Sequence, residues 1–197
     1  CKDLDKILKK NFKKNEKFKF LDYGGENIDF YMSLKKKFPN IKYYIFNQKE
    51  IINQISGINK KFNFKDFNIF KNEKDIYKIK YDFINFGSSI QYIRNFEKII
   101  LKIQKSSRLF IFFSGITFFS NNETNKNYLI AKQVNLIPTI LYCFFFNKDK
   151  FTKLFIDNNY FCEFDRLSLT DNVSFFNFKI VNNLSYRDIL FRRRKKI

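Results

Sequence analysis

Apolar positions in the first third of the chain follow two alternating periods, which predicts strands separated by helices. A short apolar run at 18–21 predicts a strand, and apolar residues at helical spacing over 28–38 predict a helix that stops before a proline. The run 41–46 predicts a second strand, and an isoleucine stripe over 51–57 predicts a helix that ends at a glycine. The segment 62–64 predicts a short third strand. These elements form two consecutive βα units.

The same rhythm continues and then changes in the second half of the chain. Strands are predicted at 81–86 and 109–113, with a helix over 90–103 between them. An aromatic segment and a helix over 148–156 follow. Two further strands, at 160–164 and 175–181, are close enough in sequence to pair antiparallel. The pattern therefore predicts an α/β fold with a mostly parallel, doubly wound sheet and a C-terminal antiparallel hairpin.

Length and composition favour a single domain over residues 1–197. The chain is 45% hydrophobic and 20% aromatic, which is enough for one substantial core, and no Pro/Gly/Ser-rich linker divides it. The first residue is Cys1 and the chain opens within a helical pattern, so we expect an N-terminal portion to be missing.

The segment around the first predicted strand contains the most informative motif. The apolar run ends in Asp22, Gly24 and Gly25 just before the next helical pattern, an arrangement typical of the turn that builds the nucleotide pocket of a doubly wound fold. Glycine permits positive φ and a close ligand approach, and an acid at the strand end accepts hydrogen bonds from an amino group. The alternative is a glycine turn of an ordinary βα unit.

The formal net charge of +19 admits a nucleic-acid-binding protein, because lysine-rich surfaces bind phosphates. The chain is also rich in Asn, Phe, Ile and Tyr and has no Trp or His, preferences that follow adenine- and thymine-rich codons. We therefore favour a solvated basic surface without a dedicated polyanion site. The densest cluster, Arg192 to Lys196, is expected to be a hydrated basic tail, with contact to phosphates or an anionic membrane as the alternative.

Cysteine usage argues against a metal site and favours a reducing compartment. Cys1, Cys143 and Cys162 lie far apart without CxxC spacing, and the chain has no histidine to complete a zinc site. We expect Cys143 and Cys162 to be buried, reduced thiols in a cytoplasmic protein. No signal peptide is visible, and the longest apolar stretches, 109–119 and 136–146, are shorter than the ~20 residues that span a bilayer.

Several local strings in this order resemble a bacterial family of class I S-adenosylmethionine-dependent methyltransferases found with surface-polysaccharide and O-antigen genes. The strings span nearly the whole chain. They are Leu21–Gly25, Phe46–Gln48, Ser88–Tyr92, Tyr142–Phe146 and Tyr160–Asp165.

The resemblance implies S-adenosylmethionine as cofactor and a set of residues that would bind it. These are Asp22, Tyr23, Gly24 and Gly25 under the methionine part, Asn47 and Gln48 beside the ribose, Asp66 near the adenine, and Ser88, Ser89 and Gln91 at the mouth of the site.

The chain departs from the family pattern at two places. The Gly-x-Gly-x-Gly pattern keeps its first glycine at Gly24, but Glu26 and Ile28 occupy the positions of the other two. The acid that takes the ribose hydroxyls is replaced by Asn47, which accepts a hydrogen bond without charge assistance. A catalytically inert scaffold of the same fold is therefore an alternative function.

The acceptor implied by the resemblance is a sugar or glycan precursor, on a free, nucleotide-linked or lipid-linked carrier. Methyl transfer from a sulfonium is an in-line displacement, so the site mainly positions the reactants and excludes water. A sugar hydroxyl needs a base, and without histidine the candidates are Asp, Glu or Lys side chains, Tyr92 and Tyr142. Ser114, Gly115 and Thr117 follow the fifth predicted strand and are candidates for the acceptor pocket.

Overall fold

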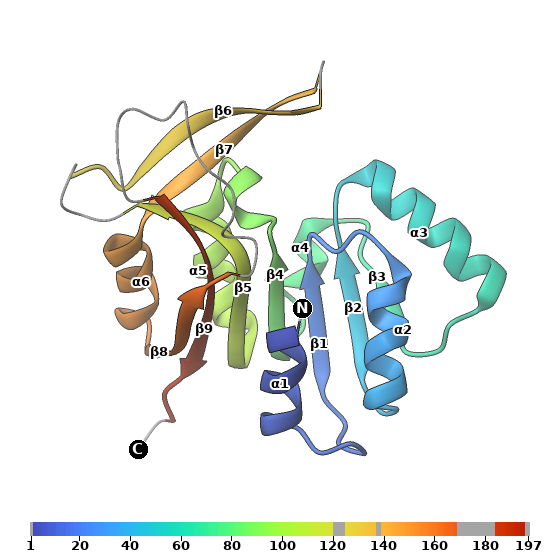
Figure 1. Cartoon of the computed structure of the whole chain (residues 1–197). Helices are drawn as coiled ribbons and strands as arrows, with labels where there is room; N and C mark the ends of the chain where they lie inside the picture. The colour runs from blue at the N-terminus through green and yellow to red at the C-terminus, as the bar shows by residue number, and fades with distance from the viewer. Residues whose placement is uncertain (1, 120–124, 137–138, 169–183, 196–197) are drawn as a thin grey trace.

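The computed structural model describes residues 2–119, 125–136, 139–168 and 184–195 (Figure 1). The helices in these ranges are α1 (Lys2–Asn11), α2 (Ile28–Lys37), α3 (Lys49–Phe62), α4 (Glu73–Ile76), α5 (Phe96–Ser106) and α6 (Lys148–Ile156), with a 3-10 turn η1 (Ile90–Tyr92). The strands are β1 (Lys19–Tyr23), β2 (Lys42–Phe46), β3 (Phe67–Ile69), β4 (Tyr81–Gly87), β5 (Ser107–Phe119), β6 (Tyr128–Leu136), β7 (Thr139–Asn147), β8 (Tyr160–Leu167) and β9 (Leu184–Arg193).

The strands form one mixed sheet whose central part is parallel. β3, β2, β1, β4 and β5 are neighbours in that order and pair parallel. β9 pairs antiparallel with β5, and β8 pairs antiparallel with β9, so the predicted class of fold is confirmed. The chain leaves β1 toward β2 and leaves β4 toward β5, on opposite sides of the β1–β4 pair. In such sheets, ligands bind at the carboxyl ends of these two strands.

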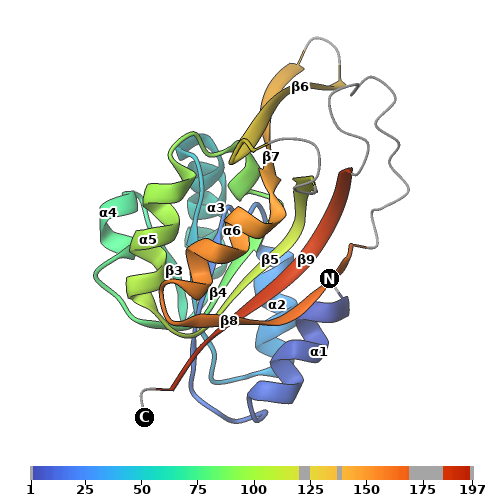
Figure 2. The ribbon, with the colours of Figure 1, turned by 90° about the vertical axis from the view of Figure 1, so that its left-hand side faces the viewer.

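Helices cover both faces of the sheet (Figure 2). Aromatic side chains contribute much of the two cores between helices and sheet. On one face, α1, α2 and α3 bury apolar side chains against Phe20, Tyr43, Phe83 and Phe112. On the other face, α5 and α6 pack against a separate set of strand residues. Successive strand residues point to opposite faces, so continuous apolar runs are expected for strands buried on both sides.

The β6–β7 hairpin rises above the carboxyl ends of the parallel strands (Figure 1). It joins the sheet where the end of β7 pairs with Phe118 and Phe119 of β5, beyond the end of β4. Tyr142 lies on this hairpin and is 66% exposed. The aromatic segment predicted around Tyr142 is therefore a strand, buried at its end and exposed in its middle.

The end of α3 and the strand that follows it differ from the prediction. α3 does not end at Gly57 but continues to Phe62, and Asn63, in the left-handed region at φ 48°, is its C-cap. The third strand is therefore at Phe67–Ile69 and not at 62–64. A glycine weakens a helix by only about 1 kcal/mol, which the apolar face of α3 outweighs.

The strand β9 was not predicted from the sequence. β9 ends at Arg193, so Arg192 and Arg193 belong to the sheet and not to a hydrated tail. Arg192 contacts Glu163 at 3.5 Å and lies over the Phe110 ring, and Arg193 bonds the Tyr160 hydroxyl. The predicted strand at 175–181 lies outside the described residues.

The two described cysteines differ in their surroundings. Cys143 is buried, and burial raises the pKa of its thiol to about 11. Cys162 on β8 is exposed, so the prediction that it is buried was wrong. None of the helices in the described ranges is long and apolar enough to cross a bilayer.

Candidate functional site

The turn after β1 needs glycine at two consecutive positions. Gly24 has φ +86°, and its N–H donates to the Phe46 carbonyl at 2.7 Å, which fastens the turn to β2. A Cβ on Gly24 would lie 2.4 Å from the Cβ of Ser89. A Cβ on Gly25 would lie 2.2 Å from Asp22 Oδ2. Backbone conformation and close approach together exclude larger residues from the turn.

Asp22 ends β1 beneath this turn and is 4% exposed. Its Oδ2 accepts a 2.6 Å hydrogen bond from the Tyr43 hydroxyl, and its Oδ1 accepts a 2.7 Å bond from Asn85 Nδ2. Burial raises the pKa of Asp22, and the two hydrogen bonds oppose that rise. The carboxyl group therefore links β1, β2 and β4 through side chains.

Asn47, directly after β2, uses both ends of its carboxamide within the protein. Its Nδ2 donates to the Gly25 carbonyl at 2.9 Å, and its Oδ1 accepts from the Gln48 N–H at 2.7 Å. Gln48 is exposed and is the N-cap residue of α3. Asn47 thus holds the glycine turn against the start of α3.

The segment after β4 meets the glycine turn from the other side. Ser89 Oγ donates to the Tyr23 carbonyl at 2.9 Å, and Ser88 Oγ donates to the Ser114 carbonyl at 3.1 Å. Gln91 is 1% exposed and donates from Nε2 to the Gly115 carbonyl at 3.2 Å. These bonds join the ends of β1, β4 and β5.

A cavity of about 310 Å³ opens between these elements at the carboxyl edge. Its walls come from α1, the glycine turn, the start of α2 and the ends of β4 and β5. The lining residues are Leu4, Asp22, Gly24, Gly25, Glu26, Asn27, Phe30, Asn85, Gly87, Ser88 and Ser114.

Sequence reasoning overlooked two important lining residues, Asn85 and Glu26. Asn85 is a polar residue inside the apolar run of β4, and that interruption is the signal that could have identified it. Its Oδ1 is buried and has no hydrogen-bond partner among the described residues. A buried polar atom without a partner next to a cavity is a place where a ligand donor fits.

Several predicted site residues lie elsewhere. Asp66 precedes β3, at the amino end of the sheet, and pairs with Lys35 at 2.9 Å, so the structure does not bring it to the cavity. Tyr142 is on the β6–β7 hairpin and does not line the cavity. Tyr92, in η1, is 41% exposed. The role of either tyrosine in catalysis stays a prediction.

Of the three residues proposed for the acceptor pocket, one, Ser114, lines the cavity. Gly115 donates its N–H to the buried Asp188 at 2.8 Å, and Thr117 is fully buried and donates to the Phe144 carbonyl at 2.6 Å. Thr117 is therefore part of the packing between β5 and β7.

The cavity is electrostatically unlike the rest of the protein. Lys and Arg make up 38 of 197 residues, yet none of those that the structure describes lines the cavity, whereas Asp22 and Glu26 do. Glu26 lies close enough to Asp22 to raise the pKa of that carboxyl. The cavity therefore favours a ligand that carries positive charge and hydrogen-bond donors.

No family model matches the sequence, and no curated protein matches it. Solved structures do match. The N-terminal domain of EvdMO1, crystallised in the presence of S-adenosylhomocysteine and D-fucose, is 9% identical with a TM-score of 0.63, over 90% of this chain and 76% of that one. The O-methyltransferase of the Brevibacillus brevis trans-AT PKS multienzyme, in complex with S-adenosyl-L-homocysteine, is 13% identical with a TM-score of 0.70. The match covers 96% of this chain and 71% of that one.

A third match extends over nearly the whole of both chains. The SAM-dependent methyltransferase from Methanosarcina mazei is 12% identical with a TM-score of 0.60, over 96% of this chain and 98% of that one. This chain has the class I methyltransferase fold. At these identities the likeness shows the fold alone, and the role of each residue has to be argued from the cavity itself.

Proposed function

We propose that this chain is an S-adenosylmethionine-dependent methyltransferase. The observation that carries the proposal is the cavity at the carboxyl ends of β1 and β4, which combines a glycine cradle with acidic and amide side chains and has no basic residue among its described lining. S-adenosylmethionine carries a sulfonium and an ammonium group, and both suit such a cavity. The fold neighbours EvdMO1 and the Brevibacillus enzyme were crystallised with S-adenosylhomocysteine, which agrees with this choice.

The residues present fit the methionine part of the cofactor. The backbone of Gly24 and Gly25 leaves open the space that a Cβ would fill, and Asn85 Oδ1 offers an unused acceptor. Ser88 and Ser114 line the opposite wall. Bound there, the cofactor would supply an electrophilic methyl group.

The chain's own residues have three tasks in such a transfer. Asn47 holds the glycine turn in place while Asp22 ties β1 to β2 and β4, and Leu4 and Phe30 form an apolar wall that excludes water. A base has to accept the proton of the acceptor hydroxyl, and Tyr92 is a candidate for that base.

We propose a sugar or glycan precursor as the acceptor. This choice rests on the resemblance of the sequence strings to methyltransferases of surface-polysaccharide loci. It also draws support from EvdMO1, which was crystallised in the presence of D-fucose.

Incubation of the protein with methyl-labelled S-adenosylmethionine and a panel of free and nucleotide-linked sugars tests this function. We expect label transfer to a sugar and release of S-adenosylhomocysteine. Tight cofactor binding without transfer to any sugar, amine or phenol acceptor would instead support an inert scaffold.

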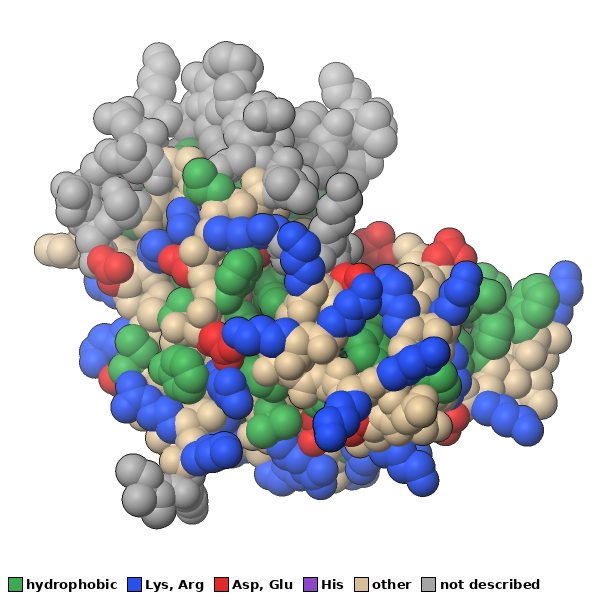
Figure 3. All heavy atoms as spheres, turned by 60° about the horizontal axis from the view of Figure 1, so that its bottom comes forward, with side chains coloured by type: hydrophobic (Ala, Val, Ile, Leu, Met, Phe, Trp, Pro, Cys, Tyr) green, Lys and Arg blue, Asp and Glu red, His purple; other side chains and the backbone are tan. Residues whose placement is uncertain are grey.

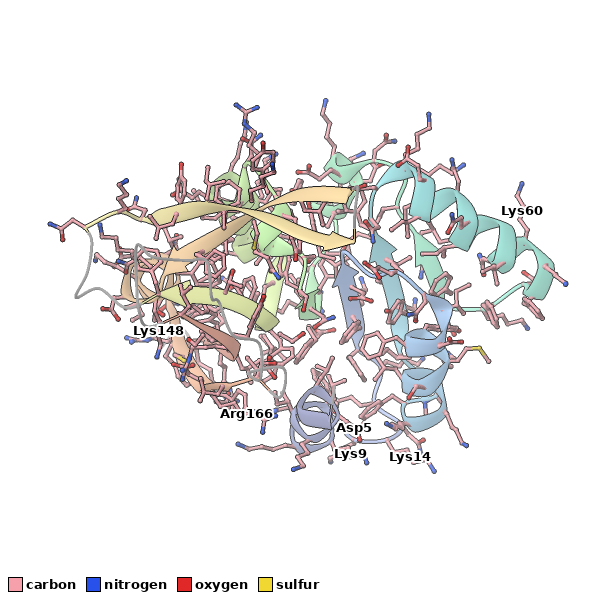
Figure 4. All side chains as sticks on the ribbon, turned by 45° about the horizontal axis from the view of Figure 1, so that its top comes forward. Asp5, Lys9, Lys14, Lys60, Lys148 and Arg166 are labelled. Carbon is pink, nitrogen blue, oxygen red and sulfur yellow. The ribbon has the colours of Figure 1, made fainter. Side chains whose placement is uncertain are left out.

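A second candidate function, binding of a polyanion, is favoured by a groove of about 880 Å³ between the C-terminal ends of α1 and α2. Five lysines line it: Lys9, Lys13, Lys14, Lys36 and Lys37. Asp5 contacts two of them, Lys9 at 3.1 Å and Lys37 at 2.8 Å. Figure 4 shows Asp5, Lys9 and Lys14 together at this end, and Figure 3 shows Lys and Arg spread over the face below.

Fluorescence anisotropy with a single-stranded RNA oligonucleotide tests this candidate. If the groove binds phosphates, replacing Lys13, Lys14 and Lys36 by serine weakens binding and lowers its salt dependence. The matched control replaces Lys60, Lys61 and Lys74, which are exposed lysines outside the groove. Equal weakening in both triple variants would show unspecific attraction to a basic surface.

A further inference from the structure

Glu26 occupies a position where the family pattern has a glycine, and no hydrogen bond or ion pair within the described residues holds its carboxylate. We propose that Glu26 binds the ammonium group of the cofactor. This inference rests on the proposed methyltransferase function. It assigns a specificity-determining role to a side chain at a position where the family pattern has a glycine.

The other acid of the cavity is already engaged. Both oxygens of Asp22 accept short hydrogen bonds, one from Tyr43 and one from Asn85, and its side chain is almost completely buried. Each bond occupies one acceptor direction and ties the carboxyl to a neighbouring strand. Asp22 therefore acts first as a link between strands.

The residue after β2 is engaged as well. Asn47 donates to the Gly25 carbonyl and accepts from the Gln48 N–H, so its carboxamide has a bonded partner at each end. It also lacks the negative charge that would attract a cation. The end of β2 thus does not supply the charge-assisted contact typical of an acid at this place.

Glu26 is acidic, unlike Asn47, and no hydrogen bond within the described residues engages its carboxylate, unlike that of Asp22. It is exposed, it lines the cavity beside Gly24 and Gly25, and it also lines the adjoining groove between α2 and α3. It precedes Asn27, the N-cap of α2, whose side chain accepts from the Phe30 N–H.

The charge of the whole chain makes a local anion important. A protein with a net charge of +19 repels a cationic ligand at long range. Only the surroundings of the site can reverse that repulsion, and Glu26 is the exposed carboxylate that lines the cavity. Removing its charge should therefore weaken a ligand that carries an ammonium group more than one that lacks it.

Calorimetric titration with two probes tests the assignment on the chain as it is. S-adenosylhomocysteine carries the ammonium group, whereas 5′-methylthioadenosine has the same nucleoside without the amino acid part. We expect Glu26→Gln to bind S-adenosylhomocysteine about tenfold more weakly than the wild type, with unchanged binding of methylthioadenosine. Glu50→Gln, on the exposed first turn of α3, is the matched control and should bind both as the wild type does.

The possible failures are distinguishable. If the wild type binds neither probe, the proposed function falls and this assignment falls with it. If the wild type binds but Glu26→Gln is unchanged, binds more tightly, or loses both probes equally, the function stands and the role of Glu26 is refuted. Unchanged thermal unfolding of Glu26→Gln verifies that the variant is folded.

Discussion

At the scale of single residues, Asn47 shows how a departure from a family pattern acquires a structural reason. An aspartate at this position would keep an acceptor for the Gln48 N–H but lose the donor to the Gly25 carbonyl. Its carboxylate would then face a carbonyl oxygen. From the sequence, Asn47 was interpreted as an uncharged substitute for an acid that binds the ribose. In the structure its carboxamide holds the glycine turn instead.

Asn47→Asp is therefore expected to destabilise the protein and not to improve cofactor binding. Loss of one hydrogen bond with an unfavourable contact costs about 1–2 kcal/mol of unfolding free energy. Urea denaturation of the variant and the wild type measures the difference. Tighter binding of S-adenosylhomocysteine by Asn47→Asp at undiminished stability would contradict this account.

Asp22 makes a pH-dependent contribution to stability. Burial raises its pKa above the ordinary value of 3.8, so the folded state holds the proton more tightly than the unfolded state. The stability that this group contributes is complete below about pH 3.8 and is lost as pH rises through the raised pKa. In Asp22→Asn the side chain at this position has no group that titrates.

Denaturation curves between acidic and neutral pH test this linkage. The unfolding free energy of the wild type, measured relative to Asp22→Asn at each pH, should fall as pH rises. The comparison cancels the titration of groups common to both proteins. A relative stability that instead increases with pH would mean that the hydrogen bonds from Tyr43 and Asn85 outweigh desolvation.

At the scale of elements, two glycines have opposite roles. Gly24 has a positive φ and no room for a Cβ, whereas Gly57 lies within α3 with nothing within 4 Å of a built Cβ. Gly24→Ala should cost more than about 1 kcal/mol and abolish cofactor binding, because the turn has to move. Gly57→Ala should raise stability by up to about 1 kcal/mol.

Thermal unfolding of both variants, with binding of S-adenosylhomocysteine as a second readout, measures this contrast. Gly57→Ala is the control for the general effect of adding a methyl group. Equal stability changes in the two variants would refute the role of the turn.

The order of elements was predictable because the apolar period is imposed by burial. The helix over Lys148–Ile156 was predicted with both boundaries, since its apolar stripe ends where the polar residues begin. The end of α3 at Phe62 was not predicted. The sequence alone does not show that Ile52 and Ile55 anchor the helix strongly enough for it to continue through Gly57. Arg192 and Arg193 looked like a tail because their partners, Glu163 and Tyr160, are distant in sequence.

The candidate site was predictable only where backbone geometry decides it. Asp22, Gly24 and Gly25 form the expected turn because few residues other than glycine adopt that backbone. Asp66 was misplaced because the third strand was predicted too early, which put a residue of the preceding loop at the carboxyl end. Asn85 left a local signal, the polar interruption of an apolar strand, but that Asn85 and Glu26 line one cavity depends on the packing of β1 against β4.

At the scale of the whole molecule, charge repulsion opposes folding. The chain has 38 basic and 19 acidic residues, and the ion pairs are mostly at the surface, where each contributes about 0–1 kcal/mol. Added salt screens the repulsion between lysines over distances of about 10 Å. The thermal midpoint should therefore rise between low and moderate sodium chloride concentration.

Scanning calorimetry in the absence of ligand, at several salt concentrations, measures this effect. A sulfate-free salt avoids specific anion binding in the lysine groove. A midpoint that falls with salt would indicate that attractive ion pairs dominate the surface.

The most direct test of the account is calorimetric titration of the wild type with S-adenosylhomocysteine, repeated with Gly24→Ala. We predict saturable binding at one site, with a dissociation constant between about 1 μM and 1 mM, that is lost in the variant. No detectable heat and no protection against thermal unfolding at millimolar ligand would contradict the proposal that the cavity binds this cofactor.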